Sequence, residues 1–224
     1  MKLHSIESSY EKDEREMLLS LANPGDVLFD VGAYVGWYSA DFASKVPESK
    51  AYAFEPIPEC RKELNKNIAN LKNVFVYSFG LSDKTDFVDF YISEREPGTA
   101  SMAPLEEDRF GPSTVIKKLV TTLDEQCCEY HPTPNIIKID VEGAELLVLV
   151  GAKRIIEKHL PIIQCEMLRK WTKRFNYHPN DIIAFLSQFG YKCFTLSNGN
   201  LQPFKEMTDE ITETNFFFLP ERTL

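Results

Sequence analysis

A glycine-spaced turn follows a short apolar segment near the start of the chain. The segment covers residues 27–31, and the turn reads Asp-Val-Gly-Ala-Tyr-Val-Gly from Asp30 to Gly36. Glycines at 32 and 36 would let the backbone turn tightly and let a ligand approach closely at the start of a helix. A dinucleotide fingerprint needs Gly-x-Gly-x-x-Gly, so the missing middle glycine favours a smaller adenosyl ligand over a nicotinamide dinucleotide. A strand-to-helix turn without a ligand is the alternative.

An acidic residue closes the next apolar segment, about 20 residues after the glycine turn. The sequence there is Tyr52-Ala53-Phe54-Glu55-Pro56. In open α/β sheets an acid at this place hydrogen-bonds the ribose hydroxyls, and a carboxylate suits a vicinal diol. An N-cap acid is the alternative, because the nearby prolines favour a helix start. The spacing from the glycine turn favours the ribose interpretation.

Ionisable residues gather at the end of a later apolar segment. It reads Lys138-Ile-Asp140-Val-Glu142-Gly-Ala-Glu145. Lys138 and Asp140 share one face of a strand by the two-residue period, and they would emerge at its carboxyl end, where open α/β sheets bind ligands. For Glu145 we expect the plainer role of an acid at a helix start, stabilised by the helix dipole.

The elements that must position these residues alternate between strand and helix. We expect strands at residues 27–31, 50–55, 73–77, 135–140, 161–166, 191–196 and 215–219, and helices at 11–22, 37–44, 59–71, 181–189 and from about 142 to 149. This alternation predicts βαβ units and a mostly parallel sheet. Only about 18 residues with little helical signal join the last two strands, so we expect those two to pair antiparallel.

Together these motifs resemble the FkbM family of S-adenosylmethionine-dependent methyltransferases. The resemblance spans about residues 14–170. Its blocks are D-V-G-A-x-x-G-x-Y-S at 30–39, A-F-E-P at 53–56, L-S-D at 81–83, G-x-x-S at 98–101, T-L-D at 122–124, K-I-D-V-E-G-A-E at 138–145 and P-x-x-x-x-E at 161–166. The chain departs from the family at Tyr34, where asparagine is usual, and at Gly80, where alanine is commoner.

The resemblance implies a Rossmann-like class I methyltransferase fold. Its sheet would be seven-stranded and mostly parallel, with an antiparallel last strand and helices on both faces, in a single domain over residues 1–224. The implied reaction is methyl transfer from S-adenosylmethionine to oxygen, on sugars or hydroxylated small molecules. The expected cofactor contacts are Asp30, Gly32, Ala33, Tyr34, Gly36, Glu55, Pro56, Gly80, Leu81, Ser82 and Asp140.

A hydroxyl acceptor must lose its proton, and a well-placed base contributes typically about 10²–10⁴-fold to the rate. Asp140 and Glu142 are the candidate bases, and Lys138 would orient them or polarise the acceptor. A Mg²⁺-type carboxylate site at Asp140 is a minor alternative, and the four scattered histidines show no metal-ligand spacing.

Two segments suggest how an acceptor is held. The cation-rich run 169–175 follows the fifth strand and could form a platform for a sugar ring or an acidic group, although a solvated helix face is the alternative. Residues 93–114 are rich in glycine and proline between two expected strands, at 87–91 and 115–120, and we expect them to form a lid with Ser101 facing the pocket. The candidate substrate-binding residues are Ser101, Glu166, Arg169 and Trp171.

Composition limits the remaining choices. The 224 residues carry 25 Lys+Arg and 34 Asp+Glu, a net charge of −9 that disfavours a general nucleic-acid binder. No apolar run approaches the roughly 18 residues of a membrane span. Five cysteines without a C-x-x-C pair indicate reduced thiols and a cytoplasmic protein. An N-methyltransferase acting on an amine, protein or RNA, and a cofactor-binding module without catalysis, are the rival functions, and the oligomeric state stays open.

Overall fold

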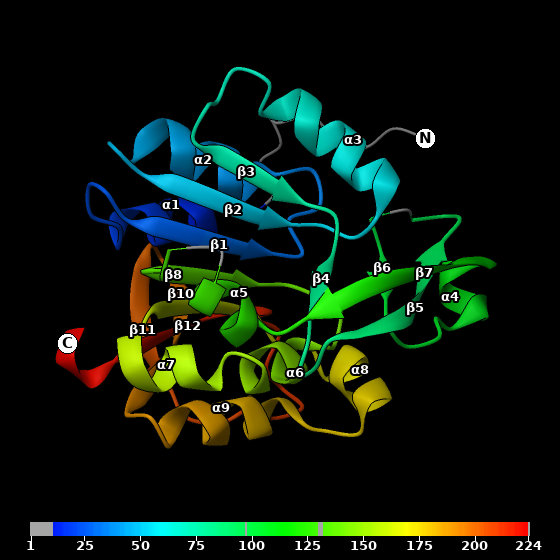
Figure 1. The fold of residues 1–224 in the computed structure, drawn as a ribbon. Coiled ribbons are helices and arrows are strands. Elements are labelled where there is room, and N and C mark those ends of the chain that lie inside the picture. Colours follow the sequence, from blue (N-terminus) through cyan, green and yellow to red (C-terminus); the bar gives the residue numbers. More distant parts are fainter. Residues whose placement is uncertain (1–10, 97, 130–131, 224) are drawn as a thin grey trace.

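The computed structural model describes residues 11–96, 98–129 and 132–223, with the side chains of 128 and 129 left out. Its central sheet has eight strands in the order β11-β10-β12-β9-β8-β1-β2-β3 (Figure 1). The strands are β1 (Val27–Val31), β2 (Lys50–Phe54), β3 (Val74–Tyr77), β8 (Ile136–Ile139), β9 (Ile162–Glu166), β10 (Tyr191–Ser197), β11 (Asn200–Phe204) and β12 (Asn215–Pro220).

The pairing follows the expectation of a mostly parallel sheet. Strands β9, β8, β1, β2 and β3 run parallel to one another, whereas β12 lies antiparallel between β9 and β10. Every residue of β1 and β8 is buried, as in parallel strands covered on both faces. The antiparallel pairing of the last two expected strands is therefore confirmed.

Helices cover both faces of this sheet, as expected. Phe29 and Phe54 pack toward the face that carries α5 (Leu123–Glu129), α6 (Glu145–Val150), α7 (Lys153–His159) and α9 (Pro179–Ser187). Leu28 and Ile136 pack toward the opposite face, against Leu18 and Phe42 from α1 (Lys12–Ser20) and α2 (Trp37–Lys45). Helix α3 (Pro58–Asn67) contributes Leu64 to a further cluster beside α2.

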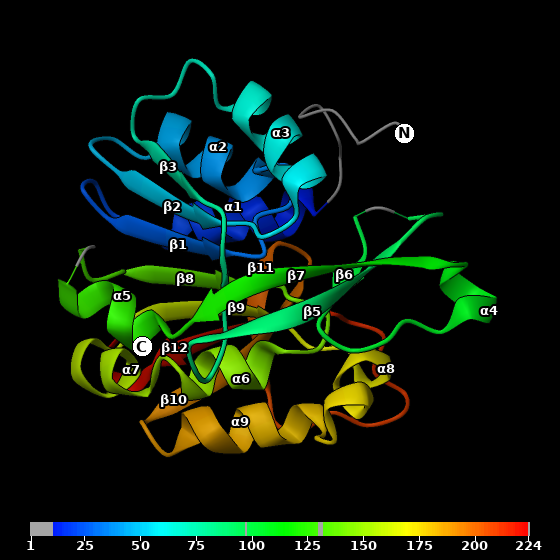
Figure 2. The same ribbon diagram turned by 45° about the vertical axis from the view of Figure 1, so that its right-hand side comes forward.

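A second sheet of four strands is inserted after β3. Its order is β4-β7-β5-β6, with β4 (Gly80–Leu81), β5 (Asp86–Ser93), β6 (Ala100–Ser101) and β7 (Ser113–Thr121). The expected strands at 87–91 and 115–120 are thus the long antiparallel pair β5–β7, which projects to one side of the main sheet (Figure 2). The loop between them is partly folded, because it contains β6 and the short helix α4 (Glu107–Phe110).

The main sheet has eight strands where seven were expected. Strand β11 pairs with β10 across the turn at Asn198 and Gly199, both with positive φ, which is the usual hairpin chemistry for Asn-Gly. Strand β4 and helices α5 and α7 were also missed, because short elements lack a full period of apolar residues. The remaining short helices are α8 (Arg169–Thr172), η1 (Lys173–Phe175) and η2 (Glu221–Thr223), and no described helix is long and apolar enough to cross a membrane.

Candidate functional site

A cavity of about 580 Å³ opens at the carboxyl ends of β1, β2 and β8, roofed by the inserted sheet. This size is typical of small-molecule sites. Of the expected cofactor residues, Gly32, Ala33, Tyr34, Glu55, Pro56, Gly80, Leu81 and Asp140 line it, and so do the expected catalytic residues Lys138 and Glu142. Three distant motifs therefore meet around one space, because parallel strands place their carboxyl ends on the same edge of the sheet.

Glu55 sits at the end of β2 with its carboxylate directed at backbone donors. Its two oxygens accept hydrogen bonds from the N–H groups of Tyr34 and Ile57, each at 2.8 Å. The residue is only 5% exposed, and burial raises the pKa of its carboxyl to about 7 against the opposing effect of these two bonds. Each oxygen keeps a lone pair for a further donor, so the group can also accept from a ribose hydroxyl.

Packing within the protein requires glycine at both positions of the turn. A Cβ on Gly32, whose φ is +75°, would lie 1.8 Å from the carbonyl oxygen of Asp140. A Cβ on Gly36, whose φ is +85°, would lie 2.9 Å from Leu64. Gly36 does not line the cavity, so its expected approach to the ligand stays a prediction without support from this geometry. Tyr34 also adopts a positive φ of 52°, a conformation that asparagine tolerates better than most residues.

Asp30 was expected to contact the cofactor; it is buried and does not line the cavity, and that contact stays a prediction. One carboxylate oxygen accepts from the backbone N–H and the hydroxyl of Ser39, at 3.1 and 2.6 Å. The other oxygen lies 3.9 Å from the Lys138 ammonium. Asp30 thus ties the first turn of α2 to β1 and holds a charge beneath the cavity.

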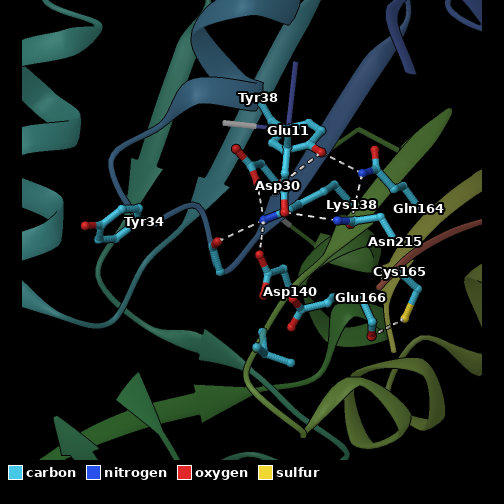
Figure 3. A network of polar contacts seen from close by, with 12 residues as sticks. Glu11, Asp30, Tyr34, Tyr38, Lys138, Asp140, Gln164, Cys165, Glu166 and Asn215 are labelled. Atoms are coloured by element: carbon cyan, nitrogen blue, oxygen red, sulfur yellow. Dashed lines mark hydrogen bonds and ion pairs between the residues drawn. The ribbon is translucent and has the colours of Figure 1, made fainter. Parts of the chain in front are cut away.

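Lys138 is the hub of the polar network (Figure 3). Its ammonium donates to the Gly32 carbonyl and to Asp140 Oδ2, each at 3.2 Å, and lies over the ring of Tyr38 at 5.1 Å. Although burial lowers the pKa of Lys138, the charges of Asp140, Asp30 and Glu11 raise it above its ordinary value. The side chain is therefore a fixed cation that orients Asp140.

Glu11 and Tyr38 also line the cavity, and neither was anticipated from the sequence. Glu11 accepts from the Tyr38 hydroxyl at 3.1 Å and from the Asn215 amide at 3.0 Å. Gln164 donates to Tyr38 at 2.6 Å and contacts Asn215 at 3.3 Å. These partners come from β9, β12 and α2, so no local pattern could have revealed them.

The two glutamates that follow β8, Glu142 and Glu145, have different surroundings. Glu142 has a buried Oε2 without a hydrogen-bond partner in the described structure, and burial, followed by Asp140 and Glu145, raises its pKa well above the ordinary range. Asp140, by contrast, is held by Lys138 at 3.2 Å, so its carboxylate is the better oriented of the two candidate bases. Glu145 accepts from the N–H groups of Val141 and Gly143 and so braces the turn.

The expected substrate residues lie outside the cavity lining. Ser101 is buried and donates to the Glu142 carbonyl at 2.9 Å, so it does not face the pocket, although Thr99, Ala100 and Met102 beside it do. Glu166 ends β9 and was expected to touch substrate. It lies near Asp140 in Figure 3 without reaching the cavity wall.

The basic run near α8 is not an open platform. Arg169 donates to the backbone carbonyls of Thr208 and Asp209. Trp171 is buried between the Phe110 ring, 5.3 Å away, and the Arg174 guanidinium, 4.4 Å away. The geometry does not favour the sugar platform expected at these two residues, because Arg169 and Trp171 already contact other parts of the protein.

Ser82, expected to contact the cofactor, does not line the cavity, in contrast to Gly80 and Leu81. It is buried, and its hydroxyl donates to Asp83 Oδ1 at 3.1 Å. In the described part of the chain no three His, Cys, Asp or Glu side chains are grouped to hold a metal ion; His4 and His131 lie outside that part.

The amino-acid sequence is similar to those of known methyltransferases. A family model described as the methyltransferase FkbM domain matches residues 30–193. Three relatives are methyltransferase sdnD of Sordaria araneosa (27% identical), hexuronic acid methyltransferase AglP of Haloferax volcanii (29%) and 2-O-methyltransferase NoeI of Sinorhizobium fredii (26%). The matches cover 64%, 66% and 66% of this chain and 66%, 58% and 65% of the respective relatives.

A solved structure supports the fold. The methyltransferase FkbM from Methylobacillus flagellatus KT aligns with a TM-score of 0.54 at 16% identity, over 86% of this chain and 43% of that protein. This match supports the class I methyltransferase architecture of the chain. With the family model covering well over half of its length, the chain belongs to the FkbM methyltransferase family.

Proposed function

We propose that this protein transfers a methyl group from S-adenosylmethionine to a hydroxyl of a sugar, a uronic acid or a related glycan. The observation that carries the proposal is the meeting of Glu55, the Gly32 turn and the Lys138–Asp140 pair around one cavity. The Glu55 carboxylate could accept hydrogen bonds from the two hydroxyls of a ribose. Gly80 and Leu81 line the same cavity, where they could provide apolar surface and backbone hydrogen bonds for adenine.

The residues fit the cofactor in size and in chemistry. The cavity is large enough for an adenosyl ligand, and its wall combines carboxylates with aromatic surfaces from Tyr34 and Trp37. Bound S-adenosylmethionine would supply the methyl group on a sulfonium. The protein would then align the acceptor and keep water away from the reacting atoms.

Asp140 is the proposed base. Lys138 holds its Oδ2 at 3.2 Å, so Oδ1 is left to accept a proton from an acceptor hydroxyl in the cavity. The lysine fixes the rotamer of Asp140 and remains charged throughout. Asp140 is part of the cavity wall and its side chain is 22% exposed, so a substrate hydroxyl can reach it.

The acceptor class is supported by two observations. The relative AglP is named as a hexuronic acid methyltransferase and the relative NoeI as a 2-O-methyltransferase; taken together, the two names support an oxygen acceptor on a sugar for this chain. In this chain the exposed Arg95 lies on the cavity wall, where its guanidinium could pair with the carboxylate of a uronic acid.

Calorimetry and a methyl-transfer screen test the proposal. The protein should bind S-adenosylmethionine and S-adenosylhomocysteine and ignore NAD. A screen with labelled methyl groups should label hexoses, uronic acids or nucleotide sugars, and not amines, proteins or RNA. With the acceptor found, Asp140→Asn should lower turnover by about 10²-fold or more, whereas Glu142→Gln should act far less. Labelling of an amine acceptor, or a fully active Asp140→Asn variant, would overturn the respective part of the proposal.

A further inference from the structure

Glu11, a carboxylate in the cavity wall, forms no ion pair within 4 Å in the described structure. Glu11 lies just before α1, and both of its oxygens accept from neutral donors, Tyr38 Oη and Asn215 Nδ2. The Lys138 ammonium is already engaged by Gly32, Asp140 and Asp30 at 3.2, 3.2 and 3.9 Å. Glu11, Asp30 and Asp140 therefore surround a single lysine, and the group exposed to the cavity is short of positive charge.

The support of Glu11 is rigid. Tyr38 is itself held by Gln164 at 2.6 Å, and Gln164 also contacts Asn215, so the two donors to Glu11 are joined by a third side chain. Gln164 and Asn215 belong to adjacent strands, β9 and β12, and are 1% and 7% exposed. The carboxylate is therefore presented to the cavity in one orientation, as a binding group should be.

Its place along the sheet indicates which part of a ligand it would meet. Glu55 ends β2, the Gly32 turn ends β1, and Lys138 with Asp140 ends β8, in that spatial order. Glu11 lies near the Lys138 end of this row. It bonds Tyr38 on α2 and Asn215 on β12, and Figure 3 shows it beside Lys138 and away from Tyr34. A ligand whose ribose lies at Glu55 and whose adenine lies at Gly80 extends its other end toward Glu11.

We propose that Glu11 binds the α-ammonium group at the amino-acid end of S-adenosylmethionine. This inference rests on the proposed function. A neutral hydroxyl acceptor would bring no charge to compensate Glu11, whereas an ammonium brings both a positive charge and N–H donors for its remaining lone pairs. A sulfonium brings charge without donors, so it suits the carboxylate less well.

The test compares three adenosyl ligands by calorimetry. S-adenosylhomocysteine carries the ammonium without the sulfonium charge, and 5′-methylthioadenosine lacks the whole amino-acid end. Glu11→Gln should weaken S-adenosylhomocysteine and S-adenosylmethionine alike, by about 10- to 100-fold, the range for a hydrogen bond to a charged group. Binding of 5′-methylthioadenosine should stay unchanged. Glu16→Gln, on the exposed side of α1, is the matched control and should change neither.

A change on the ligand checks the contact without altering the protein. N-acetylation of S-adenosylhomocysteine removes the ammonium charge, so wild-type protein should bind it about 10- to 100-fold more weakly. Glu11→Gln should add little to that loss, because both changes remove the same contact. If the Glu11 variant folds poorly, unchanged affinity of wild-type protein for the acetylated ligand would still overturn the inference.

Each other outcome overturns the inference in a recognisable way. Unchanged S-adenosylhomocysteine affinity in Glu11→Gln would show that Glu11 faces the acceptor or nothing. Loss confined to S-adenosylmethionine would assign Glu11 to the sulfonium, and equal loss for 5′-methylthioadenosine would make its role structural. Failure of wild-type protein to bind any of the three ligands would instead overturn the proposed function.

Discussion

At the scale of single residues, the site depends on one buried lysine surrounded by acids. Lys138 is 4% exposed, and its ammonium lies within 4 Å of carboxylate oxygens on Asp30 and Asp140. Removing one partner of a buried pair leaves an uncompensated charge and typically costs about 3–5 kcal/mol. Lys138 therefore serves stability as well as chemistry, and loss of activity in a Lys138 variant would not by itself show a catalytic role.

Glu55 yields a prediction for the dependence of stability on pH. Its pKa is about 7 in the fold, mainly because of burial, and near 4.5 in an exposed chain. Between these values the folded protein holds a proton that the unfolded chain has lost, so this group makes the free energy of unfolding fall as pH rises. Across the whole window the loss is roughly 3 kcal/mol.

The measurement is urea unfolding of the ligand-free protein from pH 5 to pH 8. Glu55→Gln cannot titrate, so wild type should lose stability relative to this variant as pH rises. The exposed Glu59→Gln is the control and should run parallel to wild type. A constant difference between wild type and Glu55→Gln would contradict the raised pKa.

At the scale of elements, the inserted sheet is attached to the cavity at specific points. Ser101 of β6 bonds the Glu142 carbonyl, and a Cβ on Gly98 would come within 2.9 Å of the Tyr34 ring. Arg95, Glu96, Thr99 and Met102 supply part of the cavity wall. Closure of this segment over ligands remains a prediction; Pro97, which belongs to it, lies outside the described residues.

Limited proteolysis with trypsin tests that closure. Arg95 is exposed and lines the cavity, so cleavage after it should slow several-fold when S-adenosylhomocysteine and an acceptor are bound. Cleavage near Arg109 and Lys117, in the same insertion, should slow as well. Arg154 on α7, whose side chain is 67% exposed, is the internal control. Equal cleavage after Arg95 with and without ligands would argue against a lid.

At the scale of the whole molecule, the sheet buries most of the thiols. Cys60, Cys165 and Cys193 are 2%, 0% and 6% exposed, and Cys127 is half-buried. Burial raises the pKa of the Cys60, Cys165 and Cys193 thiols above the ordinary value. Since the thiolate is the reactive form, both access and ionisation protect these three in the native fold.

A thiol-counting assay checks this arrangement. Native protein should react slowly at these three cysteines with a disulfide reagent, whereas denatured protein, kept free of reductant, should release five equivalents at once. The fifth is Cys128, whose side chain the structure does not describe. Three equivalents after denaturation would reveal a disulfide and contradict the prediction.

The sequence by itself determined the parts of this protein that depend on local pattern. Apolar runs indicate buried strands, and glycine at a strand end indicates a turn. An acid after the next strand, at this spacing, predicts a ribose contact. These signals predict the strands β1, β2 and β8. They also single out Glu55, Lys138 and Asp140, which line the cavity. They also carried the family resemblance that the family model bears out.

Only the tertiary structure decided which side chains reach the cavity. Asp30 stands in the strongest motif yet lies beneath the wall, and Trp171 in the basic run is buried against Phe110 of α4. Glu11 carries no motif and lines the cavity through a bond to Asn215, 204 residues away. Periodicity assigns a face within one element, but the direction of that face is set by packing between elements far apart in the chain.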